Sequence, residues 1–357
     1  MKKFALLLAL LMAFSMLGGC SSPSSDISSG VSSQEDTSSS SDVQSTATFV
    51  PSHPAADYFL TKSFTSEALA ENLINTDTEQ NLYIYLPPSY YDSEKSYPVV
   101  YYLHGFGENV KPFIKGRIDA LNTAFSAGAS EFILVGVNGR NKLGGSFYYN
   151  SPVTGRWEDY VVDDAVSFID SNFRTLKSSD SRGIFGFSMG GFGAFQIAFN
   201  HPDVFSSVLL VAPGLMADGD LPAVWETWER ETNVKKAYAQ AFSPNLEDTE
   251  NYGNIPEFSG TAEDNAIIED WINGYGNIHQ KVDRYLELDD SLTAVEIVYG
   301  TKDEYPWIPR GCEFLASYLN EKNIPLTLEV TSSNHSVPYN IVEKYLVPFF
   351  NENLVSE

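Results

Sequence analysis

The stretch GIFGFSMGGFGAF, Gly183 to Phe195, decides how we interpret this chain. It places Ser188 among five glycines, directly after the apolar run RGIFGF and before a run typical of a helix that ends ahead of Pro202. The residues around the serine fit G-x-S-x-G in a strand, turn and helix context. Glycines there leave room for a sharp turn that presents one uncrowded hydroxyl. A phosphate-binding loop would need a lysine beside the glycines, and none is present, so we predict Ser188 as a nucleophile.

The apolar pattern around this stretch indicates an α/β fold. Residues 81–87 alternate strictly between apolar and polar, which predicts a strand with one exposed face. Short, nearly continuous apolar runs predict strands that are buried on both faces, as in a mainly parallel sheet: YPVVYYLHG, EFILVGVNG, RGIFGF, SSVLLVAPG and AVEIVYG. Helical patterns lie over 157–173, from near Pro309, and over about 337–351. This alternation predicts a three-layer sandwich around a mainly parallel central sheet.

The amino terminus has the pattern of a lipoprotein signal. Two lysines precede an apolar run from Phe4 to Leu17, which is too short to span a bilayer comfortably and is typical of a signal peptide over residues 1–19. The sequence LGGC, which ends at Cys20, resembles the lipobox of bacterial lipoproteins, in which the cysteine is lipidated. An ordinary secretory signal that contains a cysteine is the alternative. We expect a secreted protein with a lipid anchor in the outer face of the cell membrane.

The rest of the chain divides into a tether and one large domain. Residues 20–55 are rich in serine and offer little to bury, so we expect a disordered tether. Residues 56–354 are long enough for a single large core and are expected to form the catalytic domain. Within it, the interval of about 215–292 separates two predicted strands by far more than a crossover needs. We interpret this interval as a partly helical insertion over one end of the sheet, before the predicted strand AVEIVYG.

Charge and cysteine content exclude several classes of partner. With 22 basic and 47 acidic side chains, the net charge is −25 at pH 7, so we expect no nucleic-acid partner and membrane contact through the lipid alone. The histidines are scattered and no His-Glu-x-x-His motif occurs, so we expect neither a metal nor a cofactor. Cys312 shares a predicted helix face with two leucines and is expected in the core. Nothing in the sequence indicates an oligomeric state.

A serine nucleophile needs a base, and the base needs an acid to orient it. In this kind of fold each partner should follow a later strand, in the order serine, acid, histidine. His335 comes just after the last apolar strand and just before the last helix, so it is the predicted base. His201 ends the helix that the serine opens, and His279 lies in the insertion with no strand before it.

The same test selects the acid. Asp303 lies on the loop after the strand AVEIVYG, with Glu304 as the alternative. Asp283, Asp289 and Asp290 precede that strand and are expected at the surface.

Hydrolysis through a tetrahedral intermediate also needs N–H donors for the developing oxyanion. We predict the backbone N–H of Met189, which follows the serine, and that of Phe106 in the glycine-rich turn YYLHGFGEN, with Gly107 as the alternative. His104 in the same turn is expected to be structural. Three aromatic residues, Trp307, Tyr339 and Trp157, are candidates either for stacking on a phenolic acid or sugar or for the core.

Five stretches together resemble a known family. In order and spacing, VYYLHGFGEN, GRWEDYVVDDAVSFIDSNFR, GFSMGGFGAFQIAFNHPDVFSSV, YGTKDEYP and NHS resemble the esterase D family of α/β-hydrolases, which includes feruloyl and acetyl xylan esterases. The resemblance covers about residues 65–352 and implies an α/β-hydrolase fold. It implies Ser188, Asp303 and His335 as the catalytic set, with the same two N–H groups as oxyanion hole. GVNGR stands where many relatives have a Pro-Asp-Gly turn, and the insertion is long, so the acyl pocket does not carry over.

Three functions therefore stand open. The first is a serine carboxylic ester hydrolase that acts outside the cell on acyl or feruloyl esters of plant polysaccharides, or on related short-chain esters. The second is a siderophore trilactone esterase or an acyltransferase. The third is a catalytically inactive surface-binding lipoprotein, against which the intact set of serine, acid and histidine argues.

Overall fold

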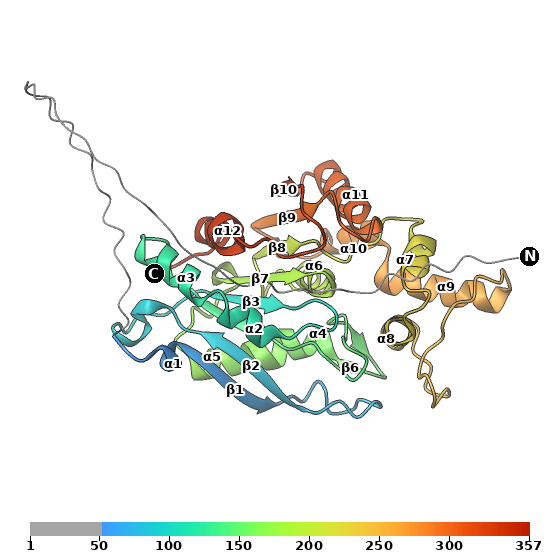
Figure 1. The fold of residues 1–357 in the computed structure, drawn as a ribbon, viewed down its shortest axis with the longest axis horizontal. Coiled ribbons are helices and arrows are strands. Elements are labelled where there is room, and N and C mark those ends of the chain that lie inside the picture. The colour runs from blue at the N-terminus through green and yellow to red at the C-terminus, as the bar shows by residue number, and fades with distance from the viewer. Residues whose placement is uncertain (1–51) are drawn as a thin grey trace, which may run out of the picture. The chain divides into compact units, whose positions relative to one another are not determined.

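The computed structural model describes residues 52–357, so the predicted signal peptide, Cys20 and most of the predicted tether lie outside the described residues. The centre of the fold is an eight-stranded sheet in the order β1-β2-β4-β3-β7-β8-β9-β10 (Figure 1). Its strands are β1 Phe59–Thr65, β2 Glu79–Tyr85, β3 Val99–Leu103, β4 Ile133–Val137, β7 Arg182–Phe187, β8 Ser207–Val211, β9 Ala294–Gly300 and β10 Leu326–Thr331. β2 runs antiparallel to both of its neighbours, and all other neighbouring pairs are parallel. The predicted mainly parallel sheet is confirmed.

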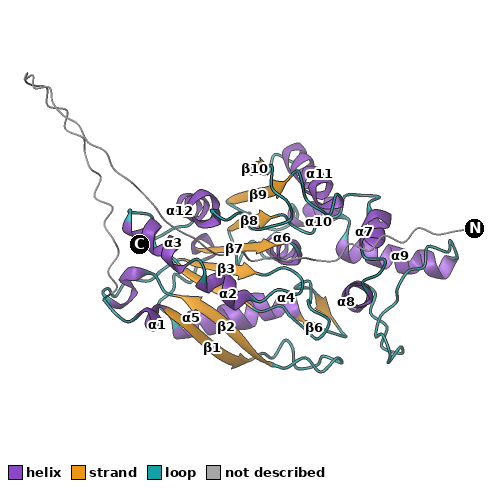
Figure 2. Cartoon of the chain, in the orientation of Figure 1, coloured by secondary structure: helices purple, strands orange, loops and turns teal. Residues whose placement is uncertain are grey.

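Helices cover both faces of this sheet (Figure 2). One face carries α4 Trp157–Asp159, the π-helical turn η2 Tyr160–Ala165, α5 Val166–Asn172, α6 Met189–Asn200, α10 Ile278–Tyr285 and α11 Trp307–Glu321. The other carries α2 Val110–Lys115, α3 Ile118–Ser126, the π-helical turn η4 Val342–Leu346 and α12 Val347–Asn353. Short elements complete the fold: α1 Ala55–Tyr58, η1 Pro88–Tyr91, η3 Ser179–Ser181 and the hairpin of β5 Asn150–Ser151 with β6 Gly155–Arg156.

The central strands are continuous apolar runs in the sequence because their side chains point alternately into two apolar cores, one on each face of the sheet. In β3, Val99, Tyr101 and Leu103 pack into the core on one face, and Val100 and Tyr102 pack into the core on the other. All five side chains are fully buried. Successive side chains of a strand point to opposite faces, so a sheet covered on both sides needs apolar residues at every position.

Most predicted elements are present, with shifted ends. The helix predicted over 157–173 is α4, η2 and α5 in succession, and a π-helical turn widens its middle. The helix expected from near Pro309 begins two residues earlier, as α11. The final helix begins later than expected, with η4. β1 was not predicted, because it is an edge strand with few buried side chains and carries no apolar alternation.

The interval predicted as an insertion, about 215–292, holds four helices. These are α7 Leu221–Thr227, α8 Thr232–Phe242, α9 Ala262–Tyr275 and α10. α10 packs against α6 and α11, and α8 packs against α9 and β5. Asp220, at the start of α7, accepts a hydrogen bond from the guanidinium of Arg310 in α11 at 2.8 Å. The insertion is thus fastened to the helix layer that also contains α6.

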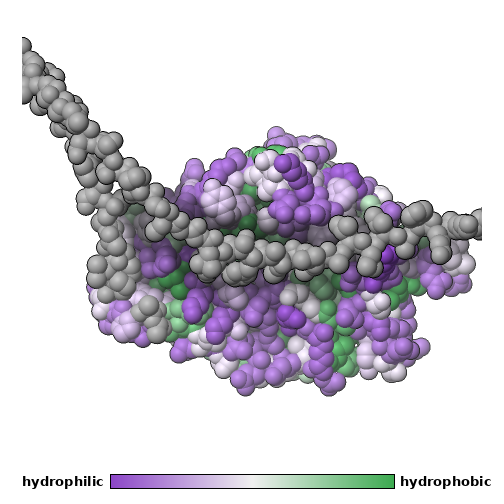
Figure 3. All heavy atoms as spheres, viewed as in Figure 1, coloured by the Kyte–Doolittle hydropathy of each residue, from purple (hydrophilic) through white to green (hydrophobic). Residues whose placement is uncertain are grey.

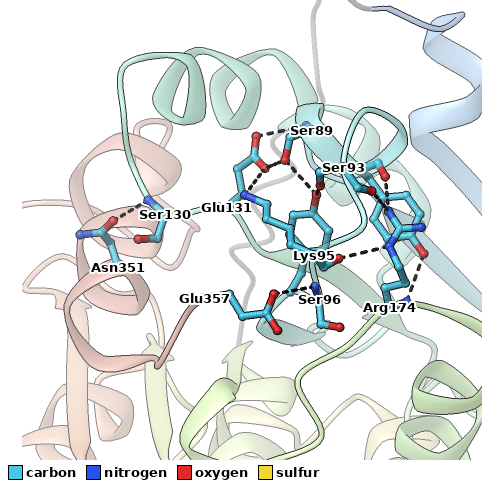
Figure 4. Close-up of polar contacts among 11 residues, drawn as sticks. Ser89, Ser93, Lys95, Ser96, Ser130, Glu131, Arg174, Asn351 and Glu357 are labelled. Carbon is cyan, nitrogen blue, oxygen red and sulfur yellow. Dashed lines mark hydrogen bonds and ion pairs between the residues drawn. The ribbon is translucent and has the colours of Figure 1, made fainter.

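A network of hydrogen bonds and an ion pair lies at the amino ends of the central strands (Figure 4). Arg174 donates to the carbonyl oxygens of Ser93 and Lys95, at 3.0 and 3.1 Å. The Glu131 carboxylate lies 3.4 Å from the ammonium group of Lys95. The carboxyl-terminal residue Glu357 accepts a hydrogen bond from the backbone N–H of Ser96 at 3.2 Å. These contacts fasten the chain end at the side of the sheet opposite to Ser188.

The described surface that faces the viewer in Figure 3 is mostly hydrophilic, with small scattered apolar areas. Between residues 52 and 357, no helix combines the length and the apolar character needed to cross a bilayer. The large apolar side chains are instead concentrated in the two cores on either side of the sheet.

Candidate active site

Ser188 occupies a strained turn between β7 and α6. Its backbone has φ 54° and ψ −116°, in a region that residues with a Cβ rarely adopt. Three backbone hydrogen bonds hold it there. The N–H of Ser188 donates to the carbonyl of Val211 at 3.1 Å, and its own carbonyl accepts from Phe192 at 3.0 Å and Gly214 at 2.8 Å. Strain of this kind persists only where the surroundings enforce it, and it is concentrated at functional sites.

The glycines around Ser188 are required for close approach. A Cβ on Gly186 would lie 1.9 Å from the carbonyl oxygen of Gly190, and a Cβ on Gly190 would lie 2.1 Å from the carbonyl oxygen of Leu103. α6 therefore begins in direct backbone contact with the ends of β7 and β3. The positive φ falls on the serine itself, so the glycines provide the space and Ser188 carries the strain.

Ser188, His335 and Asp303 form one continuous hydrogen-bonded chain. The Ser188 hydroxyl lies 2.9 Å from Nε2 of His335, and Nδ1 of His335 lies 2.7 Å from Oδ2 of Asp303. The Asp303 side chain is fully buried, and its Oδ1 accepts the backbone N–H of Tyr305 at 2.8 Å. Because a carboxylate faces Nδ1, the proton belongs on that nitrogen, and Nε2 is left to accept from the serine. The arrangement can act as a nucleophile, a base and an orienting acid.

The loops after β9 and β10 bring the acid and the base together. Asp303 follows β9 and His335 follows β10, as expected for partners at the carboxyl ends of later strands. The Glu304 carboxylate accepts the backbone N–H of His335 at 2.8 Å, and this hydrogen bond lowers the pKa of Glu304. Glu304, the alternative for the acid, thus holds the backbone of the histidine, whereas Asp303 contacts its ring.

The turn that follows β3 presents Phe106 and the first residue of α6 is Met189, the two predicted oxyanion donors. Phe106 and Met189 line the same cavity as Ser188 and His335. Within residues 52–357, neither backbone N–H donates a hydrogen bond to the protein. The N–H of Gly107, the alternative, already donates to the carbonyl of Gly144 at 2.9 Å. The geometry therefore favours Phe106 over Gly107, although the role of each N–H stays a prediction.

His104 fixes the shape of this turn. Its ring is fully buried, and burial lowers its pKa, so the imidazole is neutral. Nε2 accepts the backbone N–H of Gly139 at 2.9 Å, so Nδ1 carries the proton and donates to the carbonyl of Gly105 at 2.7 Å. The Glu108 carboxylate accepts the N–H of Gly105 at 3.0 Å. His104 is structural, as expected.

An aromatic cavity of about 290 Å³ opens beside Ser188. The insertion contributes one wall, and the loop after β9 with the first turn of α11 contributes another. The side chains that form these walls are Trp228, Val234, Tyr238, Tyr275, Tyr305, Trp307 and Ile308. Phe147, with the left-handed φ of 57°, closes the cavity from the loop before β5. Such a chamber suits an apolar or aromatic group joined to the carbonyl carbon that the serine would attack.

Of the three aromatic residues singled out in the sequence, the structure places one at the cavity. Trp307 lines it. Tyr339 is 95 % exposed, and Trp157 is buried with its indole N–H donated to the carbonyl of Thr154 at 2.8 Å. The sequence analysis did not identify the three aromatic residues of the insertion that line the cavity, Trp228, Tyr238 and Tyr275. Their signal was weak, because aromatic residues without periodicity do not indicate which cavity they line.

The remaining candidates lie elsewhere. Nε2 of His201 lies 2.9 Å from the carboxylate of Glu158, and His279 lies 2.9 Å from that of Asp218, away from Ser188 in both cases. Cys312 is fully buried in α11, and burial raises the pKa of its thiol, so it packs in the core as expected. Among the described residues, no group of histidine, cysteine and carboxylate side chains could hold a metal ion.

Comparison with known proteins identifies the fold and the family. A family model described as "Putative esterase" matches residues 74–309. A solved ferulic acid esterase superposes with a TM-score of 0.56 at 21% identity, over 83% of this chain and 98% of its own. An S-formylglutathione hydrolase from Staphylococcus aureus gives a TM-score of 0.55 at 16% identity, over 82% of this chain and 98% of its own. At these identities the likenesses show the fold, which is that of the α/β-hydrolases.

Curated relatives match this chain over only part of their own length. Esterase Rv1288 of Mycobacterium tuberculosis is 32% identical over 131 residues, which cover 35% of this chain and 27% of the relative. The endo-1,4-beta-xylanase/feruloyl esterase of Xylanibacter ruminicola is 27% identical over 150 residues, which cover 39% of this chain and 20% of the relative. The chain thus matches about a quarter of the length of the first of these relatives.

Proposed function

Since this chain belongs to the esterase family whose model spans residues 74–309, we propose that it hydrolyses carboxylic esters through an acyl-enzyme at Ser188. One observation carries the proposal: hydrogen bonds run from Ser188 through His335 to buried Asp303, and Ser188 lines an aromatic cavity. Phe106 and Met189 line the same cavity, and their backbone N–H groups, which donate to no atom of residues 52–357, are available as oxyanion donors.

The first half of the reaction forms the acyl-enzyme. The Ser188 oxygen attacks the ester carbonyl carbon while Nε2 of His335 takes the hydroxyl proton. The carbonyl oxygen becomes negative in the tetrahedral intermediate and accepts from the N–H groups of Phe106 and Met189. The bond to the alcohol oxygen then breaks, and the alcohol leaves with the proton from His335. Asp303 holds the imidazolium and fixes its orientation throughout.

The second half regenerates the enzyme with water. His335 takes a proton from a water molecule, whose oxygen attacks the acyl carbon through a second oxyanion. Ser188 leaves with that proton, and the free carboxylic acid is released. Each of the two steps uses the same donors and the same base, which is why one set of residues is sufficient.

The cavity supports an aromatic or a short acyl group. Its walls are mostly aromatic and its volume of about 290 Å³ is small, which suits a planar ring better than a long alkyl chain. A ferulic acid esterase and a xylanase/feruloyl esterase are among the similar proteins. We therefore infer acyl or feruloyl esters of plant polysaccharides as substrates. The lipobox-like sequence at Cys20 supports the further proposal that the enzyme acts outside the cell on a lipid anchor.

A panel of esters tests the proposed reaction. The protein is assayed on p-nitrophenyl acetate, p-nitrophenyl butyrate, methyl ferulate, acetylated xylan and a catecholate trilactone, next to Ser188→Ala. Ser336→Ala is the matched control, because Ser336 lies beside His335 but outside the hydrogen-bonded chain. We expect turnover of methyl ferulate or a short-chain ester, lost in Ser188→Ala and kept in Ser336→Ala. Turnover of no ester, or full activity in Ser188→Ala, would refute the mechanism.

A further inference from the structure

A second hollow, lined by polar residues alone, lies at the same edge of the sheet as Ser188. It measures about 410 Å³ and is formed by the loop before β2, the first residues of β2 and the loop after β4. Its walls carry amide, hydroxyl and charged side chains: Thr76, Gln80, Asn138, Arg140, Asn141 and Lys142 are among them. We call it the amide groove. Its composition is opposite to that of the aromatic cavity beside the serine.

The position of the amide groove relates it to the reaction. Ser188 follows β7, and the groove lies over β4 and β2, which are the second and third strands away in the sheet. Neighbouring strands are about 4.8 Å apart, so the groove lies roughly 10 to 15 Å from the serine across the sheet. Arg140, in the wall of the groove, donates to the carbonyl of Gly107 at 2.9 Å, next to the predicted oxyanion donor. A substrate long enough could occupy both places.

Two buried polar atoms in this wall have no hydrogen-bond partner in the described part of the chain. Asn141 is 7 % exposed, and its Nδ2 makes no hydrogen bond within residues 52–357, although its Oδ1 accepts the N–H of Leu143 at 2.9 Å. The hydroxyl of Thr76 is also buried without a partner among these residues. A buried polar group without a hydrogen bond is costly, so such groups mark places where a bound molecule completes the site.

The amide groove presents donors beside the carboxylates of Asp77 and Glu79, because the protein already uses its amide oxygens as acceptors. Oε1 of Gln80 accepts from Nδ2 of Asn138 at 2.9 Å, and Oδ1 of Asn138 accepts the N–H of Arg140 at 3.3 Å. The exposed guanidinium of Arg140 and ammonium group of Lys142 remain as donors, and the buried amide nitrogen of Asn141 is a further donor without a partner among residues 52–357. A ligand that fits this set carries several oxygen atoms at close spacing.

We propose that the amide groove binds the hydroxyl-rich, carbohydrate part of the ester, on the alcohol side of the bond that Ser188 attacks. The inference rests on the proposed function. A neutral ligand fits better than an anion, because Asp77 and Glu79 line the groove beside its two basic residues. The net charge of −25 also opposes an anionic ligand. Hydroxyl and ring oxygens of a sugar supply the acceptors, and the distance to Ser188 requires an oligosaccharide rather than a small alcohol.

Two isosteric substitutions test the amide groove. Thr76→Val removes the hydroxyl, and Asn141→Asp replaces the unpaired amide nitrogen but keeps the oxygen that accepts from Leu143. Each variant is compared on methyl ferulate and on a feruloylated xylo-oligosaccharide, which share the acyl group. Loss of one hydrogen bond to the sugar should weaken its binding roughly 3- to 10-fold. The kcat/KM for the oligosaccharide ester, divided by that for the methyl ester, should therefore fall by the same factor.

Controls and a binding measurement separate the groove from the reaction. Thr327→Val and Asn323→Asp are the matched controls, because both residues are exposed near the start of β10 and far from the groove. Binding of an unesterified xylo-oligosaccharide is measured by calorimetry on wild type and variants, with circular dichroism to verify folding. We expect saturable binding that weakens in the two groove variants only. An unchanged kcat/KM ratio, or no sugar binding by wild type at millimolar concentration, overturns the proposal. Sugar binding without turnover of any ester would refute the proposed reaction and support the groove.

Discussion

Replacement of the buried acid should disable His335 without disturbing the fold. In Asp303→Asn the new amide has the shape of the carboxylate, and its oxygen must face the N–H of Tyr305, which Oδ1 accepts at 2.8 Å in the native protein. Its nitrogen then faces Nδ1 of His335, where Oδ2 lay at 2.7 Å. Two donors cannot share one hydrogen bond, so Nδ1 loses its proton and Nε2 gains one. Nε2 would then donate to Ser188 and could not accept from it.

The expected loss is large because the tautomer is wrong in nearly every molecule. A change of this kind in a serine, histidine and aspartate set costs about 10⁴-fold in kcat. The assay is kcat on p-nitrophenyl acetate between pH 6 and about 10, with Tm measured in parallel. We expect a fall of roughly 10³- to 10⁴-fold near neutral pH with a change in Tm of only a few degrees.

Glu304→Gln provides the matched control for this experiment. The native carboxylate accepts the backbone N–H of His335 at 2.8 Å, and a glutamine amide oxygen can accept the same bond. We expect less than about a threefold change in kcat, because one neutral hydrogen bond replaces one charged bond. Asp303→Asn with more than a tenth of native kcat, or an equal loss in both variants, would refute the assignment of the acid.

Three further changes probe the turn, the core and the cavity. Gly190→Ala places a Cβ 2.1 Å from the carbonyl oxygen of Leu103, so α6 or the end of β3 must shift. We expect the free energy of unfolding to fall by about 1–3 kcal/mol and most of the esterase activity to be lost. An unchanged Tm would contradict this expectation. Burial raises the pKa of Glu296 to about 7 from an ordinary value near 4.5, so the native state loses stability as the pH rises through that interval. Thermal unfolding should therefore show Glu296→Gln gaining Tm over wild type at pH 8 but not at pH 4, and the reverse order would show that the sign is wrong. Val234→Trp adds a ring to the wall of the 290 Å³ cavity, so kcat/KM should fall more for methyl ferulate than for p-nitrophenyl acetate, and equal losses would place the acyl group elsewhere.

The sequence alone was sufficient for the parallel strands of the central sheet, and it selected Ser188, Asp303 and His335, with Glu304 as the alternative acid. Strands buried on both faces are short apolar runs, so their ends could be located, and Asp303 and His335 each follow such an end. Asp303 was preferred to Glu304 from the sequence, but the sequence could not show how the two differ, because neighbours on one loop differ only in where their side chains point. The structure directs one carboxylate to the ring of His335 and the other to its backbone.

The walls of the site could not be predicted in the same way. Tyr238 and Tyr275 lie on helices of the insertion and Trp228 directly follows another. The path of these helices over the sheet depends on tertiary contacts such as that between Asp220 and Arg310. The amide groove joins the loop before β2 to the loop after β4, which are about 60 residues apart in the chain and carry no shared motif. β1 was missed for a related reason, since an edge strand with exposed side chains lacks the apolar pattern of its neighbours.

Covalent labelling with an alkyl fluorophosphonate tests the central claim most directly. An activated serine attacks the phosphorus atom, fluoride leaves, and the adduct is located by mass spectrometry of peptides. We predict one adduct per molecule, on Ser188, with labelling that is abolished in Ser188→Ala and strongly slowed in Asp303→Asn. An unlabelled wild-type protein, or an adduct on any other residue, would contradict the assignment of Ser188 as the nucleophile.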